Sequence, residues 1–144
     1  MTKAAHAHGF TFIEIIIVVS IIGMLVGVSA IAFSSISQRS RDDRRRIDAE
    51  SLRDALDKYK SNQPGGYYPL FLDELTAGGY LDKLPVDPMT HLPDVYEYAP
   101  TNANLGVCDN VGIFCTDFLL TVNLEANGRY RIDSQAPQGR VISF

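Results

Sequence analysis

The chain has 144 residues and a formal net charge of -4, with 13 lysines and arginines against 17 aspartates and glutamates. The length fits one domain, and the acidic balance argues against a general nucleic-acid binder. Hydrophobic residues make up 46% of the chain, but an N-terminal apolar segment raises that figure and leaves roughly a hundred residues for a modest core.

The first informative feature is an acid at the head of a membrane-length apolar run. Residues 1–9 form a short polar leader, residues 9–14 read Gly-Phe-Thr-Phe-Ile-Glu, and an apolar run covers residues 15–36. An ionisable group in a transmembrane segment costs roughly 2.5–3.5 kcal/mol and therefore usually marks function. A cut after Gly9 would create an α-amino group at Phe10, and residues four apart share a helix face, so this amine is a possible partner for the Glu14 carboxylate.

The apolar run has three possible interpretations. Its length satisfies the roughly 20 residues that a transmembrane helix needs, and a buried core helix would rarely be so uniformly rich in Ile and Val. A secretory signal peptide is the third, with Ala30-Ile31-Ala32 as its cleavage site and Phe33 as the mature start. The run exceeds the usual apolar region of roughly 7–15 residues in such signals, so the transmembrane helix is preferred.

An amphipathic helix is predicted directly after the apolar run. No proline occurs between Phe10 and Pro64, so one helix is expected over residues 10–61, roughly 75–80 Å long, and stopped by residues 62–66. Ion pairs are expected on the solvent-exposed face of this helix, between Arg44 and Asp48 and between Asp54 and Lys58. Its apolar stripe is expected to contain Ile47, Leu52, Ala55, Leu56 and Tyr59.

Arginines are concentrated at the start of this amphipathic part, between residues 39 and 46. They could bind anionic lipid, DNA or another subunit, but the interleaved acids favour a solvated, subunit-facing helix surface. Lys3 is the only fixed side-chain cation before the apolar run, so the positive-inside rule would place the C-terminal part in the cytoplasm. The cleavage motif and the cysteines described below require the opposite topology, which is the one we adopt.

The rest of the chain has loop and strand character. A short helix is expected over residues 70–75, ending near Gly78-Gly79, followed by a proline-containing loop. Strands are expected at residues 96–98, 118–124 and 129–133, the last two joined by an Asn127-Gly128 turn. Residues 134–144 are expected to form a loose end. The predicted fold class is α+β, a long helix packed on a small antiparallel sheet.

The two cysteines, Cys108 and Cys115, lie close together in a loop-like stretch. In an exported domain such a pair indicates a disulfide, and in a cytosolic protein it indicates two thiols or a weak metal site. With the exported topology adopted above, Cys108 and Cys115 are expected to form a disulfide that closes a small loop. No histidine lies at the spacing from these cysteines that a zinc finger requires, which argues against a zinc site. His91 is expected at the surface. The chain has no motif of a known catalytic or nucleotide site, so we expect neither enzymatic activity nor a cofactor.

The segment Gly9-Phe10-Thr11-Phe12-Ile13-Glu14, with its leader and apolar helix, resembles the prepilin signal of type IV pilins and type II secretion pseudopilins. The resemblance implies that a prepilin peptidase cuts after Gly9 and N-methylates Phe10, and that Glu14 serves subunit assembly. Two departures are His8, where the family often has Lys or Arg, and the lack of a proline near the middle of the helix.

A second resemblance extends beyond the signal. The order of Tyr68-Pro69, Leu75, Gly79-Tyr80-Leu81, Leu84-Pro85, Asp87-Pro88 and Tyr96-Glu97-Tyr98 is similar to the segment after the first helix in many pilins and major pseudopilins. It implies a pilin fold. A calcium site like that of major pseudopilins is a minor alternative, with Asp87, Asp94, Asp109, Asp117 and Asp133 as candidate ligands, although no dense acidic loop is present.

Together these expectations describe a leader at residues 1–9, a transmembrane and assembly helix at residues 10–36, and a globular pilin domain at residues 37–144. The expected function is that of a structural subunit of a type IV pilus-like filament. The alternatives are a pseudopilin or a membrane-anchored or secreted binding domain. The expected partners are prepilin peptidase, other copies of the chain, an inner-membrane assembly platform and membrane lipid, with nucleic acid possible but unsupported. The precursor is expected in the cell membrane with its N-terminus in the cytoplasm, and the assembled filament outside the cell.

Overall fold

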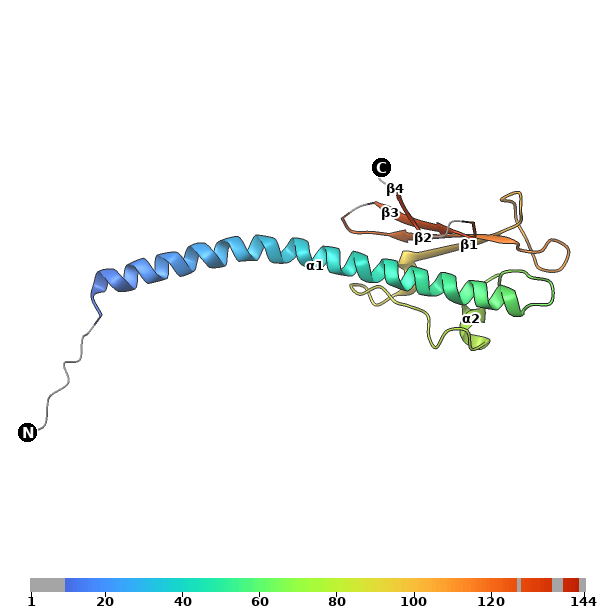
Figure 1. The fold of residues 1–144 in the computed structure, drawn as a ribbon, viewed down its shortest axis with the longest axis horizontal. Helices are drawn as coiled ribbons and strands as arrows, with labels where there is room; N and C mark the ends of the chain where they lie inside the picture. Colours follow the sequence, from blue (N-terminus) through green and yellow to red (C-terminus); the bar gives the residue numbers. More distant parts are fainter. Residues whose placement is uncertain (1–9, 127, 136–138, 143–144) are drawn as a thin grey trace, which may run out of the picture. The chain divides into compact units, whose positions relative to one another are not determined.

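The computed structural model describes residues 10–126, 128–135 and 139–142 and has the predicted α+β architecture (Figure 1). The helical elements are α1 (Phe12–Asn62), α2 (Asp73–Ala77) and the single 3-10 turn η1 (Pro93–Val95). The strands are β1 (Tyr96–Thr101), β2 (Asp117–Asn123), β3 (Arg129–Asp133) and β4 (Arg140–Ile142). The chain divides into two units, residues 1–37 and 38–144, and α1 contributes to both.

In the first unit, α1 is an uninterrupted apolar helix. Among the described residues, α1 alone is long and apolar enough to cross a membrane, and its most apolar 18-residue window is entirely unburied. Ser20 and Ser29 donate their hydroxyl hydrogen bonds to the backbone carbonyls of Ile16 and Leu25. This pairing satisfies both hydroxyls within the helix, as a lipid environment requires. The continuous helix predicted from the lack of proline is confirmed.

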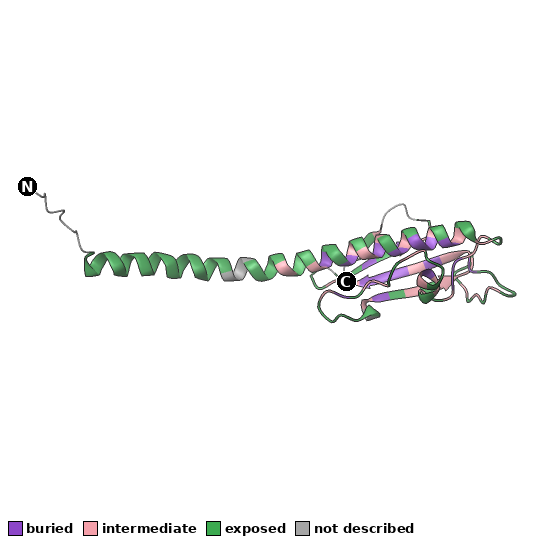
Figure 2. Ribbon diagram, turned by 90° about the horizontal axis from the view of Figure 1, so that it is seen from below, coloured by how far each residue is buried: buried purple, intermediate pink, exposed green. Residues whose placement is uncertain are grey.

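In the second unit, α1 presents a buried stripe to the sheet, visible as the purple face of the helix in Figure 2. Four of the five predicted stripe residues are buried, namely Leu52, Ala55, Leu56 and Tyr59. The prediction for Ile47 is wrong, because 63% of this residue is exposed. The buried positions recur at three- and four-residue steps from Tyr59 back to Arg45 and Asp42, and Ile47 lies two residues from Arg45, on another face of the helix.

The sheet is a fully antiparallel meander in the order β1-β2-β3-β4. β2 lies between β1 and β3, and its register places Val122 opposite Tyr96 and Leu120 opposite Ile132, all four of which are buried. The three predicted strands are confirmed. The prediction that residues 134–144 form a loose end is wrong for residues 140–142, because β4 pairs with the outer edge of β3.

The segment between α1 and η1 is attached to the core by α2. The predicted short helix is confirmed, although it begins three residues later than expected, and it ends at Gly78 and Gly79, the second of which has a φ of 72°. Leu75 of α2 is fully buried. The Glu74 carboxylate accepts hydrogen bonds from the Leu70 and Phe71 N–H groups and from the Tyr59 hydroxyl, so it joins this helix to α1.

Candidate functional site

The N-terminal signal forms the start of α1. Gly9, the predicted cleavage residue, lies outside the described residues, and Phe10 is 85% exposed. The Glu14 carboxylate accepts hydrogen bonds from the Thr11 backbone N–H at 2.7 Å and from the Thr11 hydroxyl at 2.8 Å. In return, the Glu14 N–H donates to the Thr11 Oγ1 at 3.4 Å.

This reciprocal pair is a capping box, in which a threonine before the helix and a glutamate three residues later satisfy each other's orphan groups. In this chain Glu14 therefore has an internal partner, Thr11, before any α-amino group exists at Phe10. Thr11 was not among the partners expected for Glu14, which were limited to the Phe10 amine. The Thr-x-x-Glu spacing is the signal in the sequence that identifies it. The roles of Phe10 in methylation and of Glu14 in assembly stay predictions.

A second constellation lies where α1 enters the globular unit, and Arg45 is its centre. The side chain of Arg45 is 5% exposed and contacts three carboxylates, those of Asp87 at 2.6 Å, Glu125 at 2.9 Å and Asp42 at 3.1 Å. Arg41 donates a bidentate pair of hydrogen bonds to the Glu125 carboxylate, from Nε to Oε1 at 2.8 Å and from Nη2 to Oε2 at 2.6 Å. These residues, Arg41, Asp42, Arg45, Asp87 and Glu125, are called the Arg45 cluster below.

The Arg45 cluster joins two distant segments to α1. The Asp42 carboxylate accepts hydrogen bonds from the backbone N–H groups of Glu125 and Ala126, which fastens the β2–β3 turn. The Asp87 carboxylate accepts from the N–H groups of Met89 and Thr90, which fastens the loop before η1. The prediction of a solvated arginine surface is therefore wrong for Arg45 and Asp42, which are buried, while Arg44 remains 67% exposed and makes the expected pair with Asp48.

The arginines of the cluster favour the ionised forms of the Asp87 and Glu125 carboxylates. Burial opposes ionisation of Asp87, but the hydrogen bond from Arg45 and those from Thr90 and Met89 outweigh it and lower the pKa to about 2. The Arg41 hydrogen bond likewise lowers the pKa of Glu125 against the effect of its burial. Because Arg41 and Arg45 pair with these carboxylates, both arginines contribute to the fold of the globular unit.

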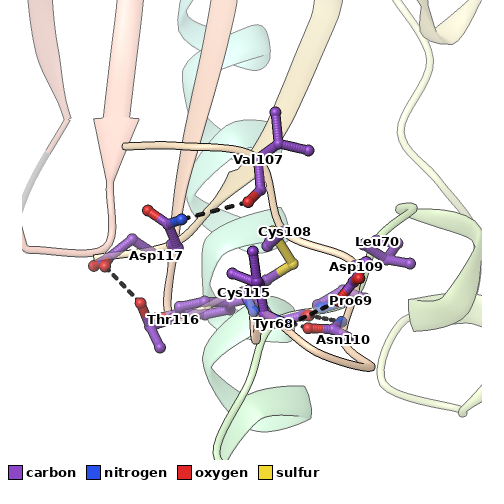
Figure 3. The surroundings of a disulfide bond; sticks show 12 residues. Tyr68, Pro69, Leu70, Val107, Cys108, Asp109, Asn110, Cys115, Thr116 and Asp117 are labelled. Atoms are coloured by element: carbon purple, nitrogen blue, oxygen red, sulfur yellow. Dashed lines mark hydrogen bonds between the residues drawn. A yellow bond between two sulfur atoms is a disulfide. The ribbon is translucent and has the colours of Figure 1, made fainter. Parts of the chain in front are cut away.

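The disulfide between Cys108 and Cys115 is present, as predicted (Figure 3). Cys115 is fully buried, and its backbone pairs with Tyr68, whose N–H donates to the Cys115 carbonyl at 2.8 Å. Inside the loop, Asp109 Oδ1 accepts the N–H groups of Val111, Gly112 and Ile113, each at 2.9 Å. Asn110 donates to the Tyr68 carbonyl and accepts from the Cys115 N–H. This network gives the loop one defined conformation.

The acids considered for calcium do not gather. Asp87 pairs with Arg45, and Asp109 accepts N–H groups of its own loop. Asp117 accepts hydrogen bonds from Ser134, Gln135 and Thr116, and Asp133 accepts the Gln135 N–H. The side chain of Asp94 lies outside the described set. Among the residues that the structure describes, no group of three or more potential metal ligands occurs. His91 is exposed, as expected, and its backbone has a φ of 59°.

Comparison with known families gives one finding. Residues 5–30 match the family described as the prokaryotic N-terminal methylation motif. The match covers the signal on which the resemblance to type IV pilins and pseudopilins rests, and it confirms that resemblance. Neither the curated proteins nor the solved structures searched contain a match.

Proposed function

We propose that this chain, a type IV pilin- or pseudopilin-like protein by its N-terminal signal, is the structural subunit of a type IV pilus-like filament. The precursor is held in the membrane by residues 10–36 of α1. Prepilin peptidase removes residues 1–9 and methylates the new terminus at Phe10. Subunits then leave the membrane and assemble through the apolar helix. The motif at residues 5–30 is the single observation that carries this proposal.

The apolar surface of α1 supports assembly through this helix. The large apolar side chains from Ile13 to Val28 are 45 to 75% exposed. Exposure of so much apolar surface to water is unfavourable in free energy. Lipid covers such a surface in the precursor, and the same helix from neighbouring copies covers it in a filament. Glu14 would then exchange its Thr11 partner for the Phe10 ammonium of its own or a neighbouring chain.

The disulfide supports the topology in which the globular unit is exported. Disulfides form and persist outside the cytoplasm and are rare within it. Arginines after the apolar run argue for the opposite orientation, but in this proposal the cleavage motif, which requires a cytoplasmic N-terminus, and the disulfide outweigh them. We therefore place the N-terminus in the cytoplasm and residues 37–144 outside, with an inner-membrane assembly platform as the partner that extracts the subunit.

A pseudopilin of a type II secretion system is the alternative, because the segment from Tyr68 to Tyr98 is similar to major pseudopilins as well as to pilins. Both share the processing and the helix-mediated assembly. They differ in the product, since a pilus extends from the cell surface and a pseudopilus is short and serves export of other proteins.

The experiment is expression with a prepilin peptidase and an assembly platform, followed by electron microscopy of sheared surface material. The wild-type chain should give filaments, and a Gly9→Val variant should remain uncut in the membrane and give none. The pseudopilin would be favoured by two results together. Cells that process the wild-type chain normally would form no surface filaments, and deletion of the chain would cause a defect in protein export.

A further inference from the structure

The sheet has one face packed on α1 and one face turned away from it. Leu120, Val122 and Ile132 belong to the same buried core as the apolar stripe of α1, which lies along the sheet in Figure 1. Successive side chains of a strand point to opposite faces. Thr121 of β2 and Arg131 of β3 therefore lie on the face turned away from α1, which is called the outward face below.

Two arginines oppose each other on the outward face. The antiparallel register pairs Arg131 of β3 with Arg140 of β4, and both residues are exposed. Directly opposed side chains have Cβ atoms about 4.5–5.5 Å apart, and like charges at such positions are destabilising. Within the described ranges, neither arginine forms an ion pair with a carboxylate. The sheet thus holds two positive charges together without a protein anion between them.

Two acids share the outward face, but neither is placed to neutralise the arginine pair. Glu97 lies on β1, two strands from β3, which corresponds to roughly 10 Å. Its carboxylate accepts a hydrogen bond from Asn123 Nδ2 at 3.3 Å. Asp133 lies two residues along β3 from Arg131, and its carboxylate accepts the Gln135 N–H at 3.0 Å.

Protection of the sheet edge does not account for the arginine pair. β4 is the last strand in the sheet order, and a charged side chain on an edge strand hinders pairing with another sheet. Arg140 alone meets that requirement. Arg131 lies on the inner neighbour β3, where an acid would attract Arg140 instead of repelling it. A second cation at this position therefore indicates that the missing partner is an anion from outside the chain.

A hydroxyl adjoins the arginine pair. Thr121 is directly opposite Arg131 on β2 and is only 7% exposed. Its hydroxyl makes no hydrogen bond to any other group in the part of the chain that the structure describes, and the oxygen is not sealed from solvent. A largely buried hydroxyl without a partner therefore lies next to two arginines without a partner.

We propose that Thr121, Arg131 and Arg140 form a binding site for a phosphate-type oxyanion. An oxyanion above Arg131 accepts charge-assisted hydrogen bonds from both guanidinium groups, whose paired donors match phosphate geometry, and one more from the hydroxyl. The bound anion replaces repulsion between the arginines with attraction to both. Free phosphate and the headgroup of an anionic phospholipid offer this same chemistry. The site goes beyond the proposed function, since it depends on neither processing nor assembly.

The first test is a titration with inorganic phosphate of the full chain in phosphatidylcholine nanodiscs, with ionic strength held constant by chloride. The Nε–Hε NMR signals of Arg131 and Arg140 should shift together and saturate, while that of Arg39, an exposed arginine of α1, should not shift. Arg131→Gln and Arg140→Gln should each weaken binding by about tenfold or more, because each loses a hydrogen bond between charged groups. Thr121→Val should weaken it less, and the matched control Arg39→Gln should bind as the wild type does.

Unfolding supplies a second readout. In chloride alone, Arg131→Gln and Arg140→Gln should have a denaturant midpoint equal to or above that of the wild type, because the repulsion is gone. Added phosphate should raise the midpoint of the wild type and of neither variant. Nanodiscs containing phosphatidylglycerol distinguish the source of the anion. A midpoint raised by free phosphate assigns the site to a soluble ligand, and one raised only by phosphatidylglycerol assigns it to a lipid headgroup.

The site would be overturned if neither phosphate source shifted the arginine signals, or if both glutamine variants bound phosphate as the wild type does. A lower midpoint of both variants in chloride would overturn the repulsion from which the site is inferred. None of these outcomes depends on filament formation, so they leave the proposed function to its own experiment.

Discussion

At the scale of residues, Arg45 is the point where three parts of the globular unit meet. Its guanidinium contacts carboxylates from α1, from the loop before η1 and from the β2–β3 turn. Removing one partner of a buried ion pair is far more harmful than the net stabilisation by the pair suggests, because the remaining charges stay buried without compensation. Arg45 is therefore expected to be sensitive to substitution.

We expect Arg45→Ala to lower the free energy of unfolding by roughly 3–5 kcal/mol. The matched control is Arg44→Ala, one residue away on the same helix, where the side chain is 67% exposed and the loss should stay below about 1 kcal/mol. Denaturant unfolding of the two variants measures the difference. Equal losses would show that burial of the Arg45 cluster has no energetic consequence.

The depressed pKa of Asp87 makes a prediction about acid. An aspartate titrates at about 3.9 in an unfolded chain and at about 2 in this fold, so the unfolded state binds more protons between these values. The resulting stabilisation is fully present above about pH 4 and is lost as pH falls toward 2. Asp87→Asn should be less stable than the wild type at pH 7 and should show a shallower loss between pH 4 and 2, in unfolding followed by circular dichroism. An unchanged acid slope in this variant would contradict the assigned pairing.

At the scale of elements, α1 shows which part of the fold its sequence could predict. The apolar stripe at Leu52, Ala55, Leu56 and Tyr59 follows from helical spacing alone, and so does the uninterrupted helix. The stripe continues to Arg45 and Asp42, which a hydrophobic pattern assigns to the solvent-exposed face. Their distant partners are not visible in the local sequence, because the Arg45 guanidinium pairs with Asp87 and Glu125 and the Asp42 carboxylate accepts the backbone N–H groups of the β2–β3 turn.

Long-range pairing also explains the error at the C-terminus. β4 contains only Arg140, Val141 and Ile142 and carries too little alternation to stand out as a strand. It exists because the outer edge of β3 offers unpaired backbone groups, which residues 140–142 satisfy. The strands at 118–124 and 129–133, by contrast, alternate clearly and flank an Asn-Gly turn, so they were predictable from local signals.

The disulfide is the covalent cross-link of the loop between β1 and β2. Replacing both Cys108 and Cys115 with serine should lower the free energy of unfolding by roughly 2–3 kcal/mol, since the bond closes a short loop and restricts the unfolded chain. In the wild-type exported protein neither thiol should react with an alkylating reagent before reduction, as intact mass will show. Labelling of both cysteines without a reductant would contradict the bond and weaken the assigned topology.

At the scale of the whole molecule, the proposed function assigns anchoring to the apolar part of α1, processing to Gly9-Phe10 and assembly to Glu14. The capping box with Thr11 explains how the precursor tolerates this carboxylate before a partner amine exists.

Glu14 is therefore expected to be needed for polymerisation and not for folding of residues 38–144. Glu14→Gln keeps the shape of the side chain and removes its charge, and Glu14→Leu also removes its polarity. Both variants should give leader-cleaved subunits in the membrane that enter filaments poorly, because neither can pair with the Phe10 ammonium. The measurement is filament yield against membrane-fraction monomer. Thr11→Val is the control, since it removes the hydroxyl and leaves the carboxylate, and it should assemble far better than either Glu14 variant. A normal filament yield from Glu14→Leu would mean that apolar packing alone drives assembly.

The central claim is that residues 1–14 form a prepilin signal, and the N-terminal mass of the mature protein tests it most directly. The chain should be isolated from cells that contain a prepilin peptidase, and its terminal peptide should be sequenced by mass spectrometry. The account predicts a terminus at Phe10 carrying a single N-methyl group. A mature terminus at Phe33, after Ala30-Ile31-Ala32, would contradict the account and identify the apolar run as an ordinary secretory signal.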